Sequence, residues 1–199
     1  MEEWRGIRNV VVAEVIKDDA DTFETGTPFS LAGVAKLIRK TPSSSESHYY
    51  DNAPMIVIDS TGADEVTVST SAIPYKPLSE VTGQDYDEEL GMFVEGERES
   101  KYFAMGYVTE KTDGTEVFVW RAKGKFNIPD STHSTKDDGT TAEGQEIVYT
   151  GVNTNHKFTV NGKKKTIKAI NIDTSINTVD ETAFFETVQT PDTVANVAA

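Results

Sequence analysis

The chain contains no cysteine, which excludes disulfides, thiolate nucleophiles and thiolate metal sites. It has no apolar run that approaches the ~18 residues of a membrane-spanning helix, so we expect no membrane partner. The N-terminal residues MEEWRGIRNVVVAEV are acidic and lack a basic start followed by an apolar stretch. They do not fit a secretory signal, and we expect the protein to remain in the cell that makes it.

Basic residues are few: 19 Lys and Arg stand against 33 Asp and Glu, which gives a net charge of −14. This balance argues against a surface that neutralises phosphates, and therefore against stable nucleic-acid binding. It suits a surface that nucleic acid passes without sticking, because like charges repel. Half of the net charge lies in one segment, where Arg98 accompanies eight acids: Glu80, Asp85, Asp87, Glu88, Glu89, Glu95, Glu97 and Glu99.

Catalytic signatures are also missing. The three histidines, His48, His133 and His156, lie in or beside polar stretches without a nucleophile-elbow motif, a phosphate-binding glycine loop or paired metal-ligand spacing. The acidic run from Asp85 fails the calcium-loop template, since Leu90 occupies the glycine position and Gly96 the final glutamate position. We therefore expect no metal, no cofactor and no enzymatic activity, although 33 acids leave an unrecognised carboxylate site open.

What is present is a series of strand patterns within a length that suits a single domain, residues 1–199. Asp113-Gly114 and Asn161-Gly162 are strong hairpin signals, because such turns need residues that accept positive φ. Runs of β-branched and aromatic residues, or alternating apolar ones, predict the strands. The predicted strands are Ile7–Ile16, Met55–Ile58, Glu65–Ile73, Tyr102–Val108, Val117–Ile128, Gln145–Gly151, Lys157–Val160 and Lys164–Ile170.

Two segments carry helical signals. In Ser30–Lys40 the residues Leu31, Val34, Leu37 and Ile38 recur at helical spacing, which predicts an amphipathic helix. Leu78–Gly83 follows Pro77 and ends on a glycine, which predicts one short helix. Together these patterns predict a mainly β fold, a β-sandwich or partly rolled barrel with one short flanking α-helix and a long loop.

The polar stretches supply the candidate interaction residues. Residues 41–54 predict a long polar loop, residues 130–141 another, and 189–199 a C-terminal end that frays. The first loop carries the aromatic pair Tyr49 and Tyr50, which fits docking onto a partner or an exposed tip. Candidates for an assembly surface or an acidic lumen are Tyr49, Tyr50, Asp85, Asp87, Glu88, Glu89, Lys163, Lys164 and Lys165. The lysines fit either a protected edge strand or a partner for the acidic segment of a neighbouring copy.

One motif extends over the predicted central hairpin: Gly106, Tyr107, Glu110, Lys111, Asp113, Gly114, Phe118, Val119, Trp120, Lys123, Gly124, Lys125, Phe126 and Pro129. Around it stand, in order, Gly6-Ile7-Arg8-Asn9, Leu31-Ala32-Gly33, Tyr49-Tyr50-Asp51-Asn52, a proline-flanked helix ending at Gly83, and Phe184-Phe185-Glu186-Thr187-Val188. This arrangement resembles the major tail proteins of long-tailed bacteriophages, the phi13-like group. The pieces are short, and they cover nearly the whole chain.

The resemblance implies a tail tube subunit: a virion protein, assembled in the cytoplasm of a bacterial host, that forms hexameric rings stacked into a hollow tube. It implies that the segment after Ala32 is a strand, against the helical spacing. The implied partners are further copies of the chain, a tape-measure protein, and tail tip and terminator proteins. An acidic lumen would let DNA slide through during ejection.

Two other classes remain open. A non-catalytic β-sandwich binding module, such as a virion decoration or carbohydrate-binding protein, would stay monomeric or trimeric and present an aromatic patch. An enzyme with an unrecognised carboxylate site would reveal itself by turnover. Microscopy of the purified protein separates stacked rings or tubes from discrete particles.

Overall fold

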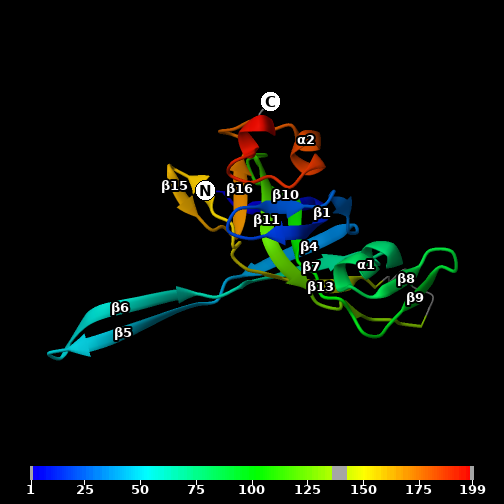
Figure 1. Ribbon diagram of the computed structural model, residues 1–199, viewed down its shortest axis with the longest axis horizontal. Coiled ribbons are helices and arrows are strands. Elements are labelled where there is room, and N and C mark those ends of the chain that lie inside the picture. Colours follow the sequence, from blue (N-terminus) through cyan, green and yellow to red (C-terminus); the bar gives the residue numbers. More distant parts are fainter. Residues whose placement is uncertain (1, 136–142, 198–199) are drawn as a thin grey trace.

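A computed structural model describes residues 2–135 and 143–197 of the chain, without the side chains of residues 54 and 196. The fold is mainly β, with 52% strand and 9% helix, and these residues form no closed barrel. Figure 1 shows a body with a long two-stranded arm at one side (Figure 1). The strands of the body are β1 (Trp4–Asp18), β2 (Phe23–Thr25), β3 (Phe29–Ser30), β4 (Val34–Lys40), β7 (Asp64–Thr70), β10 (Phe103–Lys111), β11 (Glu116–Phe126), β12 (Asp130–Ser131), β13 (Gln145–Gly151) and β16 (Ala169–Asp173).

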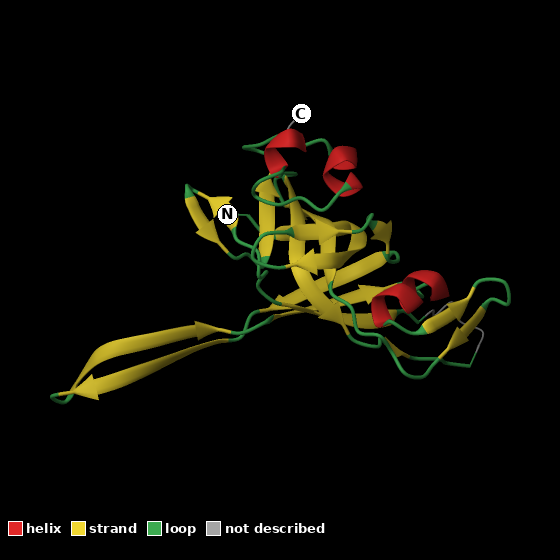
Figure 2. Cartoon of the chain, in the orientation of Figure 1, coloured by secondary structure: helices red, strands yellow, loops and turns green. Residues whose placement is uncertain are grey.

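These strands form one antiparallel sheet in the order β2-β1-β10-β11-β13-β7-β4, with β3 on β1 and β12 on β13 (Figure 2). Strand β11 changes partner along its length: Val117–Arg121 pairs with β16, and Gly124–Phe126 pairs with β13. The sheet therefore divides at β11 into two branches, one ending at β16 and the other at β4. This sandwich-like arrangement confirms the predicted fold class.

Three smaller ladders project from the sheet. They are the arm, made of β5 (Ser43–Tyr50) and β6 (Ala53–Thr61), and two short hairpins, β8 (Asp85–Asp87) with β9 (Met92–Val94) and β14 (Phe158–Val160) with β15 (Lys163–Lys165). The helices are α1 (Tyr75–Thr82), α2 (Glu181–Glu186) and the 3-10 helix η1 (Val194–Val197). Figure 2 shows α2 and η1 together at one end of the body and α1 near β8–β9 (Figure 2).

Two hydrophobic clusters lie on opposite faces of the central strands, so parts of these strands are buried on both faces. Alternate residues Val10 and Val12 of β1 enter the larger cluster, while Val11 and Ala13 enter the smaller one. In β11 the same alternation sends Val119 to the larger cluster and Trp120 to the smaller. Continuous burial fits the apolar stretches within these strands, Val10–Ala13 of β1, Phe103–Val108 of β10 and Val117–Trp120 of β11.

The C-terminal segment covers the smaller cluster. Phe184 of α2 is fully buried there, Asp180 caps the helix by accepting a hydrogen bond from the Ala183 amide, and Val194 and Val197 pack against the cluster. In the C-terminal end for which fraying is predicted, Gln189 and Thr190 are buried and Val194–Val197 forms η1. Residues 198 and 199 lie outside the described part.

The helical spacing in Ser30–Lys40 gave a wrong prediction: Val34–Lys40 is strand β4, as the resemblance implied. The strand pairs along its length with β7, and this tertiary ladder outweighs a weak local preference. The predicted helix at Leu78–Gly83 is confirmed and begins earlier, at Tyr75, with Gly83 as its left-handed C-cap. Helix α2 was not predicted.

Both turn predictions are confirmed with one difference in detail. Asn161 and Gly162 both have positive φ, as a two-residue hairpin turn needs. At Asp113-Gly114 only the glycine does, and the Lys111 amide closes the turn on the Thr115 carbonyl. The single strand expected over Lys164–Ile170 is instead the end of β15 and the start of β16.

The two predicted polar loops have different outcomes. Most of residues 41–54 form strand β5 and the tip of the arm, so the prediction of a loop there is wrong. In the second stretch, Asp130–Ser131 is strand β12, residues 132–135 have no regular structure, and the rest of the stretch lies outside the described residues.

Candidate assembly interface

The arm is an extension of the β4–β7 pair beyond the body. Strand β4 ends at Lys40 opposite Glu65, and the chain continues into β5, turns at Asp51-Asn52 and returns through β6 to β7. Both turn residues have positive φ, which gives the tight two-residue turn that hairpins favour. At ~3.3 Å per residue, β6 projects the arm about 30 Å from its root.

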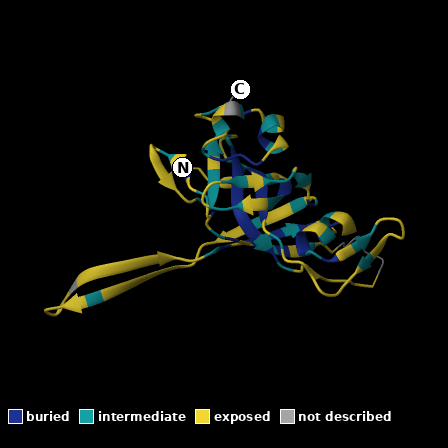
Figure 3. Cartoon of the chain, viewed as in Figure 1, coloured by how far each residue is buried: buried dark blue, intermediate teal, exposed yellow. Residues whose placement is uncertain are grey.

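Nearly all described residues of the arm are exposed, with His48 intermediate (Figure 3). Its strand β6 nevertheless carries four consecutive apolar side chains with 48% to 65% of their surface exposed: Met55, Ile56, Val57 and Ile58. Because side chains alternate along a strand, Ile56 and Ile58 lie on one face and Val57 on the other. An isolated two-stranded hairpin has little stability of its own, and exposed apolar side chains of this kind are candidates for contact with a partner.

The tip of the arm carries the predicted aromatic pair. Tyr49 is 68% exposed and Tyr50 53% exposed, both at the end of β5 beside the turn. They are free to contact a partner, and the prediction that they could do so is still open. Their position at the tip, far from the body in Figure 1, means that any partner they meet lies outside this chain (Figure 1).

The root of the arm is held by a buried cluster around Asp64, the first residue of β7. One carboxylate oxygen accepts hydrogen bonds from the Thr41 hydroxyl at 3.0 Å and the Lys168 ammonium at 3.3 Å. The other accepts from Arg121 Nη1 at 2.8 Å. Lys168 also donates to the Gly62 carbonyl. We call these four side chains the root cluster; they connect both strands of the arm to β11 and to the segment before β16.

The ion pair in this cluster is almost fully buried, since only 6% of the Asp64 side chain and 2% of the Arg121 side chain are exposed. Burial by itself would raise the pKa of Asp64, but hydrogen bonds from Arg121 and Thr41 outweigh it and hold that pKa below the ordinary value. Asp64 is thus charged at neutral pH, and the pair with Arg121 fixes the arm at its root.

A groove opens between the two branches of the sheet. Within the described residues, β4 pairs only with β7 and β16 only with β11, so each leaves one edge open. The groove has a volume of about 880 Å³. Apolar side chains from several strands line it: Ile7, Leu37, Tyr107, Val117 and Val119. Unpaired strand edges beside an apolar floor are a template for another strand.

The same groove is lined by three cations, Lys36 and Arg39 of β4 and the buried Arg121. In the described part of the chain neither Lys36 nor Arg39 forms an ion pair, whereas Arg121 pairs with Asp64. The buried Nε of Arg121 has no hydrogen-bond partner there either. This donor is covered by the chain itself and is therefore out of reach of a molecule in the groove, whereas Lys36 and Arg39 are exposed.

The predicted acidic residues lie in another place, at the end of the body that carries α1 (Figure 1). Asp85 and Asp87 belong to β8, and Glu88 and Glu89 follow in the turn, where Asp87 accepts the Glu89 and Leu90 amides. Glu88 pairs with Lys76 at 2.7 Å on the exposed surface. A polar pocket of about 600 Å³ lies between residues 79–85 and residues 97–101. Its lining includes Asp85 and three other acids of the acidic segment, Glu80, Glu97 and Glu99, but not Asp87, Glu88 or Glu89.

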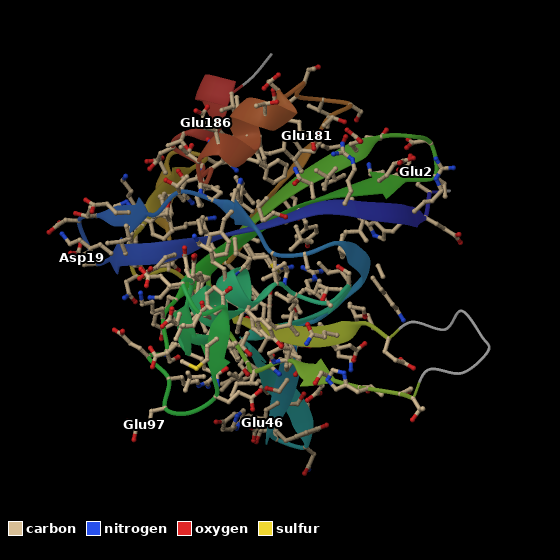
Figure 4. The ribbon with its side chains drawn as sticks, turned by 90° about the vertical axis from the view of Figure 1, so that its right-hand side faces the viewer. Glu2, Asp19, Glu46, Glu97, Glu181 and Glu186 are labelled. Atoms are coloured by element: carbon tan, nitrogen blue, oxygen red, sulfur yellow. The ribbon has the colours of Figure 1, made fainter. Side chains whose placement is uncertain are left out.

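Acidic side chains are not confined to one face. In Figure 4 the labelled acids Glu2, Asp19, Glu46, Glu97, Glu181 and Glu186 lie around the periphery of the molecule (Figure 4). The predicted basic residues Lys163, Lys164 and Lys165 form the exposed strand β15. Figure 1 shows β15 and the β8–β9 hairpin on opposite sides of the body (Figure 1). Contact between these two charged segments therefore requires a second copy.

The histidines and acids show no metal-binding arrangement in residues 2–135 and 143–197. His48 lies in the arm, His133 is exposed, and the ring of His156 packs against Phe158 with centroids 4.8 Å apart. No helix in the same part of the chain is long and apolar enough to cross a membrane. The sequence matches no protein-family model and no curated protein.

Sequence reasoning identified the tyrosines of the arm but missed the groove and the root cluster. Arg121 and Asp64 are 57 residues apart, and the groove combines strands from both ends of the chain. One local signal was available, the apolar run Met55–Ile58 directly after a polar strand and turn. It predicts a strand, which the structure confirms as part of β6, and the structure leaves its side chains exposed.

Proposed function

We propose that this chain is a tail tube subunit of a long-tailed bacteriophage, whose copies close into hexameric rings that stack into a tube. The observation that carries the proposal is the arm. It projects about 30 Å from the body and presents four exposed apolar side chains, Met55, Ile56, Val57 and Ile58, to a partner.

The open strand edges support the same reading. Strands β4 and β16 each have one free edge in the described structure, and such edges invite pairing with another chain. A heterologous contact between copies closes into rings where the rotation closes, and otherwise repeats without limit. Stacked rings use both kinds of contact: the contacts within a ring close, and the contacts between rings repeat. Tube length is then set by other components, a tape-measure protein together with tail tip and terminator proteins.

The net charge of −14 gives the tube its activity in this proposal. An acidic lumen offers no cation to hold a phosphate, so DNA passes during ejection without binding. The acids of the β8–β9 hairpin, Asp85, Asp87, Glu88 and Glu89, are the proposed rim or lining. Where these acids lie at the rim between copies rather than in the lining, Lys163, Lys164 and Lys165 of a neighbouring copy are their proposed partners. The protein then resides in the virion and is assembled in the cytoplasm of the bacterial host.

The decisive experiment is microscopy of the purified protein together with sedimentation over a range of concentrations. The proposal expects rings or tubes. It also expects that replacement of residues 43–61 by a short Gly-Ser turn yields a folded body that no longer assembles. A wild-type protein that remains a monomer at high concentration and shows discrete particles would refute it.

A binding module remains the second candidate, because Tyr49 and Tyr50 lie exposed at the tip of the arm. Paired exposed aromatics are common in interaction surfaces. In that case Tyr49→Ala and Tyr50→Ala would abolish ligand capture while the protein stayed monomeric. The tube proposal instead expects these changes to act on assembly.

A further inference from the structure

The groove between β4 and β16 has the properties of a receiving site for a strand. Its apolar lining includes the half-buried Ile7 and Leu37 above the core residues Val117 and Val119. Both flanking strands have a free edge among the described residues. The occupant should therefore offer apolar side chains together with backbone groups that pair with a free edge.

The cations that line the groove indicate that its occupant carries negative charge. Lys36 and Arg39 line it without acidic partners among the described residues, and Lys40 follows on the same strand. Strand β4 is otherwise exposed over most of its length, as expected of an edge that a partner covers. The occupant should thus be acidic as well as apolar.

The arm meets both requirements. Residues 41–63 contain three acids, Glu46, Asp51 and Asp59, and no lysine or arginine. In β6 the acid Asp59 directly follows the apolar residues Met55–Ile58. The edges of both arm strands are free on one side, so each offers backbone carbonyls as well as amides.

We propose that the groove between β4 and β16 receives the arm of a second copy, with β6 on the apolar floor and the arm's acids against Lys36 and Arg39. The chain's own arm is excluded, because it starts where β4 ends and extends away from the body (Figure 1). The proposal rests on the proposed function and adds the receiving surface to it.

Covering the arm also accounts for its apolar residues. Burying an apolar side chain stabilises a complex, and these four side chains are about half exposed. Docking therefore strengthens the contact through each of them. The arm, unstable as an isolated hairpin, would gain its stability from the second copy.

The absence of cysteine makes a cross-linking test unambiguous. Two single variants, Ile58→Cys and Leu37→Cys, are mixed and mildly oxidised; a disulfide forms only when the two Cα atoms come within about 7 Å. The expected product is a dimer of one arm variant and one groove variant. The matched control is Leu90→Cys, which places the thiol on the exposed turn between β8 and β9.

Each outcome of the cross-linking experiment supports or contradicts a stated part of the proposal. The Ile58–Leu37 product, in excess over the Ile58–Leu90 product, supports the groove as the receiving site. Rings or tubes that give only the Ile58–Leu90 product, or no arm product, overturn the groove and leave the proposed function standing. A protein without any oligomer in sedimentation overturns both.

Charge exchange gives a second test that does not depend on oxidation. The double variant Lys36→Glu and Arg39→Glu changes exposed side chains, so the body should keep its thermal stability. We expect its critical concentration for assembly to rise about two- to fivefold or more, the effect of losing exposed ion pairs. Adding Glu46→Lys and Asp59→Lys should restore assembly; failure of this rescue in a folded protein argues against the pairing.

Discussion

Arg121 of β11 and Asp64 of β7 form a buried ion pair of 2.8 Å at the root of the arm. Each side chain is almost fully covered, and Asp64 also accepts from Thr41, the residue that follows β4. The pair thus connects the hydrophobic core to the root of the arm and helps to fix the direction in which the arm projects. Its removal should affect stability and arm geometry together.

We expect Asp64→Asn to lower the free energy of unfolding by about 3–5 kcal/mol, because it leaves Arg121 buried without its counter-ion. Chemical denaturation followed by tryptophan fluorescence measures this. The neighbouring exposed residue supplies the control, Glu65→Gln, which should change stability by less than about 0.5 kcal/mol. Equal effects of the two variants would mean that the pair contributes nothing to stability.

The same pair predicts a pH dependence. The pKa of Asp64 is held below its ordinary value in the folded state, as is that of Asp18, which burial would raise but hydrogen bonds from Lys123 and from the Asn155 and His156 amides lower. A depressed carboxyl pKa stabilises the fold above the unfolded pKa, and this stability is lost as the pH falls through the folded pKa. Stability should thus be constant from about pH 7 to pH 5 and fall below about pH 4.

Denaturation series at stepwise lower pH measure this dependence. In Asp64→Asn the fall should be shallower than in the wild type, since one of the two carboxyls no longer titrates. An unchanged slope in this variant would assign the acid sensitivity to other groups.

Gly106 lies against the rings of Phe185 and Trp120, and a Cβ at this position would come within 2.9 Å of Phe185. We therefore expect Gly106→Ala to destabilise the protein by about 1–3 kcal/mol through overpacking between β10 and α2. Gly96→Ala is the matched control, because nothing lies within 4 Å of the added carbon. A thermal melt that shows the same midpoint for both variants would contradict the packing of α2 on the sheet.

The apolar residues of the arm should matter for assembly and not for the body. Ile56→Ser with Ile58→Ser changes two side chains that are about half exposed, so the melting of the isolated subunit should shift little. Assembly should weaken at least tenfold, since apolar burial on the order of 1 kcal/mol is lost at each position. Sedimentation measures the assembly, and Ser44→Ala on the polar strand of the arm is the control.

Much of the fold could be predicted from the sequence where local chemistry decides the structure. The turn at Asn161-Gly162 and the C-cap at Gly83 depend on residues that accept positive φ. The double-faced burial of β1 and β11 follows from their apolar runs. These features involve neighbours in the chain.

The arm and β4 were beyond this kind of reasoning because their structure depends on distant or missing partners. Strand β4 is exposed on most of its residues, so it lacks the alternation that would identify a strand. The serine-rich sequence of β5 has low apolar content and is held by its ladder with β6. The groove could not be predicted, since it exists only after β4, β11 and β16 come together.

The continuity of β4, the arm and β7 has a consequence for growth. Each copy would carry one arm and one groove, and β4 belongs to both, as wall of the groove and root of the arm. Any row of copies linked through this contact is therefore polar: one terminus displays unoccupied grooves and the other displays free arms. A protein that starts or stops such a row needs to imitate only one of these two surfaces, and the choice fixes the direction of elongation.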